Sequence, residues 1–239
     1  MSSVSVVLRD TDDVAGLASF LQVVSSQNWQ KEVEIIWLSE RGQSSRLHAS
    51  SRIPIKTLYL EPGLLASSEA LNRGCSLASG QCVIFTDGHT QPLGDAWISS
   101  AVEGLKHKMV AGVYAPVLPG PGASWMSRVG AGLCSIPGRL QKPRRIDRLP
   151  IPDFAPCNMA VSRAVWCRLA FPENESAWKS SQAWALAAMN LGYDLLLDWN
   201  FGARCTGYAD TQPPCEQVWS YDALEAEPDR SACPRRLVR

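Results

Sequence analysis

Short apolar segments alternate with helical patterns through the first half of the chain, and this alternation constrains the fold more than any other feature. Each apolar segment is short and rich in β-branched residues, and the segments between them space their apolar residues as helices do. The expected strands are 5–8, 33–38, 56–60 and 82–85, and the expected helices are 14–24 and 65–78. Near-continuous apolar strands separated by helices are typical of α/β proteins. We therefore expect a mostly parallel central sheet with helices on both faces.

The second half is less regular but continues the same pattern. Strands are expected at 109–117, 154–161 and 194–198, with helices at 163–169 and 176–191. We expect a single domain over 1–208, with one half at about 1–117 and the other at about 118–208. The prolines and charges of residues 209–239 predict a loosely held tail.

Composition excludes several classes of protein. Lys plus Arg and Asp plus Glu are both 23, so the net charge is zero and a nucleic-acid binder is not expected. No apolar run approaches the roughly 20 residues that span a bilayer. The acidic residues near the N-terminus do not suit a signal peptide, and none of the eight cysteines forms a CxxC pair. These observations favour a cytoplasmic protein with reduced thiols.

Polar residues follow three of the expected strands directly. They are Arg9-Asp10, Ser39-Glu40 and Asp87-Gly88-His89. The carboxyl ends of parallel strands meet at one edge of a sheet, where open α/β proteins bind their ligands. We therefore expect a binding site at this edge.

Five segments of the chain form an ordered pattern: Val4–Leu8, Ala70-Leu71-Asn72-Arg73-Gly74 with Ala78-Ser79-Gly80-Gln81, Val83–His89, Pro156–Arg163 and Leu191–Leu195. In this order they resemble the family-2 inverting glycosyltransferases, which have the Rossmann-like GT-A fold and bind nucleotide sugars. The resemblance runs from residue 4 to about 200. It implies a transferase that moves a sugar from a nucleoside-diphosphate donor, with a UDP-sugar favoured, to a glycan or lipid-linked acceptor.

The resemblance implies a metal site at Asp87 and His89, an Asp-x-His version of the family's Asp-x-Asp motif. A divalent cation, Mn²⁺ or Mg²⁺, would neutralise the charge that develops on the leaving diphosphate. Asp87 would also approach the ribose. On the three residues alone, a polar turn with a solvated histidine is the simpler interpretation; their place after the fourth strand favours the site.

The resemblance implies further nucleotide contacts at Arg9, Asp10, Glu40 and Arg73, and an acceptor contact at Asn158. Two of these positions have a structural alternative. Arg73 could be an exposed helix arginine, and Asn158 could be a turn residue whose hydrogen bonds are satisfied within the protein.

The sequence departs from the family pattern in three places. Ser39-Glu40-Arg41-Gly42 stands where the family has Asp-Asp-Gly-Ser. Either Glu40 replaces the aspartate that reads the base, or the preferred base differs. Ser180-Ser181 replaces the Glu-Asp pair that carries the general base, and a hydroxyl is too weak a base for this role. Where the family often has a late metal-binding histidine, this chain has Cys205, a soft substitute.

The missing base leaves two hypotheses open. The nearest candidate acids for the base are Glu173, Glu175 and Asp153, and Glu175 is our choice. An acid near a helix N-terminus also simply suits the helix dipole. The alternative is a catalytically inactive relative that binds a nucleotide or a protein partner. A nucleotidyltransferase is disfavoured, because no glycine-rich basic loop follows the first strand.

Two further partners are considered from the sequence. The basic segment 139–148 could close over the diphosphate or contact an anionic membrane surface peripherally, and it could equally be a solvated loop. The segment after Asp210 could contribute to a homodimer.

Overall fold

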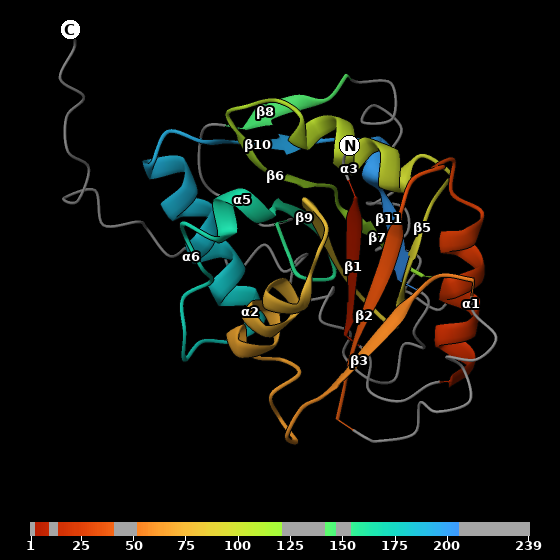
Figure 1. Ribbon diagram of the computed structural model, residues 1–239. Coiled ribbons are helices and arrows are strands. Elements are labelled where there is room, and N and C mark those ends of the chain that lie inside the picture. Colours follow the sequence, from red (N-terminus) through yellow and green to blue (C-terminus); the bar gives the residue numbers. More distant parts are fainter. Residues whose placement is uncertain (1–2, 10–13, 41–51, 121–141, 147–153, 206–239) are drawn as a thin grey trace, which may run out of the picture.

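The computed structural model describes residues 3–9, 14–40, 52–120, 142–146 and 154–205. The chain forms helices and strands in the alternation that the sequence predicts (Figure 1). The helices are α1 Val14–Ser25, α2 Ser68–Leu77, α3 Trp97–Leu105, α5 Arg163–Trp166, α6 Ala177–Asn190 and a 3₁₀ turn, η1 Trp199–Phe201. The strands are β1 Val4–Arg9, β2 Val33–Ser39, β3 Ile55–Tyr59, β4 Cys82–Asp87, β5 Thr90–Pro92, β6 Val110–Tyr114, β7 Val117–Leu118, β8 Arg144–Ile146, β9 Asn158–Ser162, β10 Asp194–Leu197 and β11 Ala203–Cys205.

Eight of these strands form one twisted sheet in the order β3-β2-β1-β4-β9-β6-β10-β8. The pairs β3–β2, β2–β1, β1–β4 and β6–β10 are parallel, whereas β9 and β8 run antiparallel to their neighbours. The expectation of a mostly parallel α/β sheet is confirmed. The reversed strand β9 lies in the middle of the sheet. Its first two residues pair near the ends of its neighbours, Asn158 with Thr86 of β4 and Met159 with Tyr114 of β6.

Helices cover both faces of the sheet, as predicted, and each face has its own hydrophobic core (Figure 1). On one face, α2 and α6 bury Leu71 and Trp184 against the sheet, and Trp184 stacks on Phe154 with ring centroids 5.7 Å apart. On the other face, α1 and α3 bury Phe20 and Trp97. The strands between them are buried on both sides, which explains their continuous apolar sequences.

Two glycines of the family-like segments allow α2 and the turn after it to approach β1 closely. A Cβ on Gly74 would lie 2.6 Å from a methyl group of Val7, and a Cβ on Gly80 would lie 2.6 Å from the backbone nitrogen of Ser5. Asn72, two residues before Gly74, accepts hydrogen bonds from the Trp166 indole and the Phe171 amide, and it donates to the Phe171 carbonyl. This part of the motif therefore serves packing.

The structure differs from the predicted elements where short or irregular segments occur. The strand expected over 109–117 is divided into β6 and β7, because Pro116 cannot continue a ladder. The helix expected over 163–169 stops at Trp166, and the one expected from Leu65 begins at Ser68, whose preceding residue Ser67 caps it. A small second sheet, β5-β11-β7, was not predicted. The tail 209–239 lies outside the described residues.

No helix in the described part of the chain combines the length and apolar character that crossing a membrane requires.

Candidate functional site

The carboxyl edge of the sheet brings together two of the predicted site residues, Arg9 and Asp87. They are directly opposite each other at the ends of the parallel strands β1 and β4, so their side chains lie on the same face. The Arg9 Nη2 atom lies 3.9 Å from the Asp87 Oδ2 atom. The Gly88 amide donates to the Arg9 carbonyl at 3.0 Å and fixes the turn that follows β4. The predicted convergence of polar strand ends therefore occurs for these two strands.

Arg9 is the more buried member of this pair, with 11% of its side chain exposed. Its Nη1 atom donates to the Leu65 carbonyl at 3.3 Å, whereas its buried Nε atom has no partner among the described residues. Burial lowers the pKa of this guanidinium, and the neighbouring Asp87 carboxylate opposes that shift. An arginine side chain remains charged in proteins. The edge of the sheet therefore holds a cation with an unused hydrogen-bond donor.

Asp87 is partly exposed, at 17% of its side chain, and one of its oxygens has a fixed partner. The Thr90 hydroxyl donates to Asp87 Oδ1 at 2.7 Å across the turn. His89 is exposed in the same turn, between β4 and β5. The carboxylate and the imidazole of the Asp-Gly-His motif are therefore presented by one tight turn at the edge of the sheet.

Cys157 is a neighbour of this pair that the sequence did not predict. It is buried in a small cluster with Cys205 of β11, and its thiol interacts electrostatically with Asp87 and Arg9. Burial raises the pKa of the Cys157 thiol to about 12, and the Asp87 carboxylate adds to this rise. The Cys157 thiol is therefore protonated at neutral pH. The only signal in the sequence was its place just before Asn158 in the family-like segment.

Glu40 follows β2 at the same edge, but its carboxylate contacts the protein's own backbone. Glu40 Oε1 accepts hydrogen bonds from the amides of Gly63 and Leu65, each at 2.9 Å. A role for Glu40 in binding the nucleotide base stays a prediction. Asp10, predicted beside Arg9, lies outside the described residues.

A match to a family model covers residues 29–168 of this sequence, and that model describes glycosyl transferase family 2. The match spans more than half of the chain. The chain belongs to glycosyl transferase family 2.

Solved glycosyltransferase structures share the fold of this family 2 domain at low sequence identity. The mannosyltransferase PcManGT from Pyrobaculum calidifontis, in complex with GDP-Man and Mn²⁺, has a TM-score of 0.64 at 16% identity, covering 88% of this chain and 58% of that one. TarS residues 1–349 from S. aureus, in complex with UDP-GlcNAc, has a TM-score of 0.58 at 13% identity, covering 86% and 58%. GalNAc-T7 with UDP, GalNAc and Mn²⁺ has a TM-score of 0.60 at 14% identity, covering 90% and 45%.

These likenesses confirm the GT-A fold of the family 2 domain. The chain spans less than two thirds of the length of each of these three structures. The sequence has no significant match among curated proteins.

The Asp-Gly-His turn of the family 2 domain fits a divalent cation by the chemistry of its donors. A carboxylate and an imidazole suit Mn²⁺, and a carboxylate suits Mg²⁺. No cluster of three or more histidine, cysteine, aspartate or glutamate side chains able to hold a metal occurs among the described residues. A cation bound by Asp87 and His89 would therefore need further ligands from its substrate or from water.

Asn158, the predicted acceptor contact, is buried in the core and makes its side-chain hydrogen bonds there. It is 1% exposed, and its side-chain nitrogen donates to the carbonyls of Ala115 and Phe201 at 3.1 and 2.9 Å. Its side-chain oxygen accepts from the Trp97 indole at 2.9 Å. Both amide hydrogens are therefore used within the protein, which agrees with the alternative of a residue whose hydrogen bonds are satisfied internally. An acceptor contact from Asn158 stays a prediction.

Arg73 lies on the outer side of α2, where its guanidinium pairs with Glu69 one helical turn earlier. Nearly half of its side chain is exposed. Arg73 therefore has the surroundings of an exposed helix arginine, the structural alternative for this position. A nucleotide contact from Arg73 stays a prediction.

The segment of the expected general base has two different environments. Ser180 and Ser181 are fully buried on α6, and their hydroxyls donate to the carbonyls of Pro172 and Phe154. Glu175 is exposed just before α6, and its backbone carbonyl accepts from the Ser68 amide at 2.9 Å. The connection that precedes Ser68, the first residue of α2, also provides the Leu65 carbonyl that Arg9 contacts. The backbone of Glu175 is therefore hydrogen-bonded to the start of α2, next to the connection that contacts Arg9 at the carboxyl edge of the sheet.

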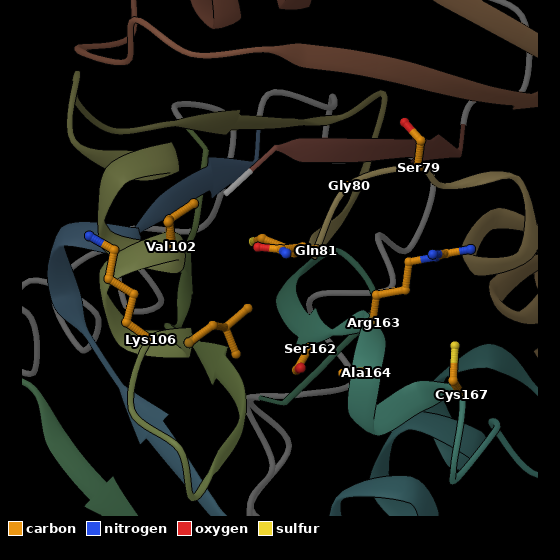
Figure 2. A pocket seen from close by; sticks show the side chains of 11 residues that line it. Ser79, Gly80, Gln81, Val102, Lys106, Ser162, Arg163, Ala164 and Cys167 are labelled. Atoms are coloured by element: carbon orange, nitrogen blue, oxygen red, sulfur yellow. The ribbon is translucent and has the colours of Figure 1, made fainter. Parts of the chain in front are cut away.

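A cavity of about 480 Å³ lies at the opposite, amino edge of the sheet. Figure 2 shows Gln81, just before β4, between Lys106, which follows α3, and Arg163 of α5. Because β4 begins beside this cavity and ends at Asp87, the cavity is separate from the Arg9–Asp87 pair.

Proposed function

We propose that this family 2 domain transfers a sugar, with inversion, from a nucleoside-diphosphate sugar to a glycan or lipid-linked acceptor. A UDP-sugar is the favoured donor. The observation that carries the proposal is the pairing of Arg9 with Asp87 at the ends of neighbouring parallel strands, immediately before the Asp-Gly-His turn. Similar solved structures that contain GDP-Man, UDP-GlcNAc or UDP, two of them with Mn²⁺, support it.

The side chains at this edge suit the charge of a leaving diphosphate. Departure of the nucleotide builds negative charge on its phosphate oxygens, which fixed cationic donors stabilise. Arg9 supplies such a charge from a buried position, with its Nε–H group unused by the described residues. Asp87 and His89 would hold a Mn²⁺ or Mg²⁺ ion, which when bound acts as a Lewis acid on the phosphates.

Inversion also requires a base that removes the proton of the acceptor hydroxyl. The buried Ser180 and Ser181 hydroxyls both donate to carbonyl groups and cannot do this. In this proposal the exposed Glu175 carboxylate accepts that proton. Asp10 and Arg73 are further proposed contacts of the nucleotide.

A second candidate is a domain that binds the nucleotide without transferring the sugar. The burial of Ser180-Ser181, where the family carries its acidic pair, favours it. The two candidates share the donor site and differ only in turnover.

Calorimetric titration of UDP and GDP, with and without Mn²⁺, tests the shared donor site. Wild-type protein is expected to bind tightly only with Mn²⁺, and Asp87→Ala is expected to lose about 100-fold or more in affinity because it removes a carboxylate ligand of the cation. Asp95→Ala, which removes an exposed carboxylate before α3, serves as the matched control and should bind as wild type does. A nucleotide affinity that is the same without Mn²⁺ and in Asp87→Ala would refute the proposed donor site.

Donor turnover with the same proteins separates the two candidates. Glu175→Gln should keep nucleotide affinity but lose transfer and donor hydrolysis, whereas the neighbouring Glu173→Gln should keep both. If wild-type protein binds nucleotide and turns over no donor sugar, the non-catalytic candidate stands.

A further inference from the structure

The connection between β3 and α2, residues 60–67, is held by backbone hydrogen bonds from two sides. Its first amide, on Leu60, donates to the Ser39 carbonyl at the end of β2, at 2.8 Å. Near its other end, the Ala66 carbonyl accepts from the Ala177 amide of α6, at 2.7 Å. Both ends of the connection are therefore hydrogen-bonded to the protein at the carboxyl edge of the sheet.

Glu40 holds the middle of this connection through a single carboxylate oxygen. Glu40 Oε1 accepts from both Gly63 and Leu65, at 2.9 Å each. Hydrogen bonds from amides to a charged carboxylate are about twice as strong as neutral ones. Gly63 has a φ of +88°, so the turn places its amide in a backbone conformation that favours glycine.

Leu65 joins Glu40 to Arg9. Its amide donates to Glu40, and its carbonyl accepts from Arg9 Nη1 at 3.3 Å. Arg9 in turn lies against Asp87. Because the Leu65 peptide groups are held by Glu40 on one side, the position of the carbonyl that orients the guanidinium depends on the Glu40 carboxylate.

We propose that Glu40 is a positioning residue of the donor site: it fixes Leu65, whose carbonyl orients Arg9 toward Asp87 and the diphosphate. This inference rests on the proposed function for the identity of the ligand. It assigns Glu40 to the diphosphate end of the donor, through Arg9, and not to the base. The consequence is that Glu40 affects all nucleoside diphosphates alike.

The ratio of UDP to GDP affinity separates the two roles of Glu40. Glu40→Ala should weaken both nucleotides by about tenfold, the loss expected from a misplaced charged hydrogen bond, and should leave their ratio unchanged. Glu40→Gln keeps one acceptor oxygen without the charge and should give an intermediate loss. Glu61→Ala removes an exposed acid from the same connection and serves as the control. A change in the UDP-to-GDP ratio would mean that Glu40 reads the base, and it would overturn the proposal.

Nuclear magnetic resonance of the same variants gives a readout that does not depend on nucleotide binding. In Glu40→Ala and, more weakly, Glu40→Gln, the amides of Gly63 and Leu65 should lose protection from hydrogen exchange, and the Arg9 guanidinium resonances should shift. Unchanged Arg9 resonances would refute the positioning role, whatever the affinities. If these changes occur and wild-type protein binds neither nucleotide, the positioning of Arg9 stands and the proposed donor site fails.

Discussion

At the scale of single residues, the acid with the most perturbed environment in the described chain is not in the site but at the opposite edge of the sheet. Glu34 on β2 accepts from the Ser5 hydroxyl and from the amide and hydroxyl of Ser79, and it pairs with Lys56 at 2.7 Å. Burial alone would raise its pKa, but Lys56, Ser5 and Ser79 outweigh burial and lower the pKa from 4.5 to about 2. Glu34 therefore joins β1, β2, β3 and the turn before β4.

Glu34→Gln is expected to destabilise the protein in a pH-dependent way. A carboxyl whose folded pKa is depressed contributes stability above its unfolded pKa and loses it as the pH falls toward the folded pKa. Denaturant unfolding should show a deficit on the order of 2–3 kcal/mol at pH 7 that shrinks between about pH 4.5 and pH 2. Glu32→Gln, which removes an exposed carboxylate just before β2, serves as the control. A deficit of equal size at every pH would contradict the linkage.

At the scale of elements, α6 determines what can replace the missing acidic pair of the family. Ser181 Oγ donates to the carbonyls of Phe154 and Trp178, so its surroundings are acceptors. A carboxylate at this position would face carbonyl oxygens in a buried site. The serines are therefore matched to their environment, and an acid cannot be restored there by itself.

Ser181→Asp should accordingly lower the free energy of unfolding by about 3 kcal/mol or more and should not raise turnover above that of the wild-type protein. Lys179→Asp is the control on the same helix; it is exposed in the first turn, where a negative charge is tolerated or favoured by the helix dipole. Chemical denaturation and donor turnover measure the two effects. A stable and more active Ser181→Asp protein would show that α6 can still present a base.

The sequence predicted the elements of the first half well, because hydrophobic periodicity is a local signal. It identified Asp87 and Arg9 by their places after strands, and register then brought them together. It could not show that the Asn158 side chain forms its hydrogen bonds with Ala115, Phe201 and Trp97, since those partners are distant in the chain. A residue of a family motif can have a structural or a functional role, and only its hydrogen-bond partners in the fold distinguish the two.

At the scale of the whole molecule, the central strands of the sheet are the most strongly protected from local unfolding. Strands β1, β4 and β9 are buried between two helical layers and paired on both sides, whereas β3 and β8 each have one neighbour within the described chain. The reversed direction of β9 was beyond sequence analysis, because strand direction depends on connections and not on composition. The short strands of the second sheet carry too few residues for a periodic signal.

Hydrogen exchange should reflect this arrangement. Amides of β1, β4 and β9 are expected to exchange only through global unfolding, and those of β3 and β8 on the order of 100-fold faster or more through local opening. Mass spectrometry of exchanged peptides measures the difference. Equal protection of β8 and β1 would mean that further chain covers the β8 edge.

The connection between β3 and α2 also determines where the protein can accept inserted residues. Surface connections usually absorb insertions, because their backbone groups face water. Here Glu40, Arg9, Ser39 and Ala177 each hold a backbone group of residues 60–66. A residue added between Leu60 and Ala66 would displace the held groups on one side of the insertion relative to those on the other. For a protein engineer, this connection belongs to the scaffold, and a tag or grafted loop should be placed elsewhere.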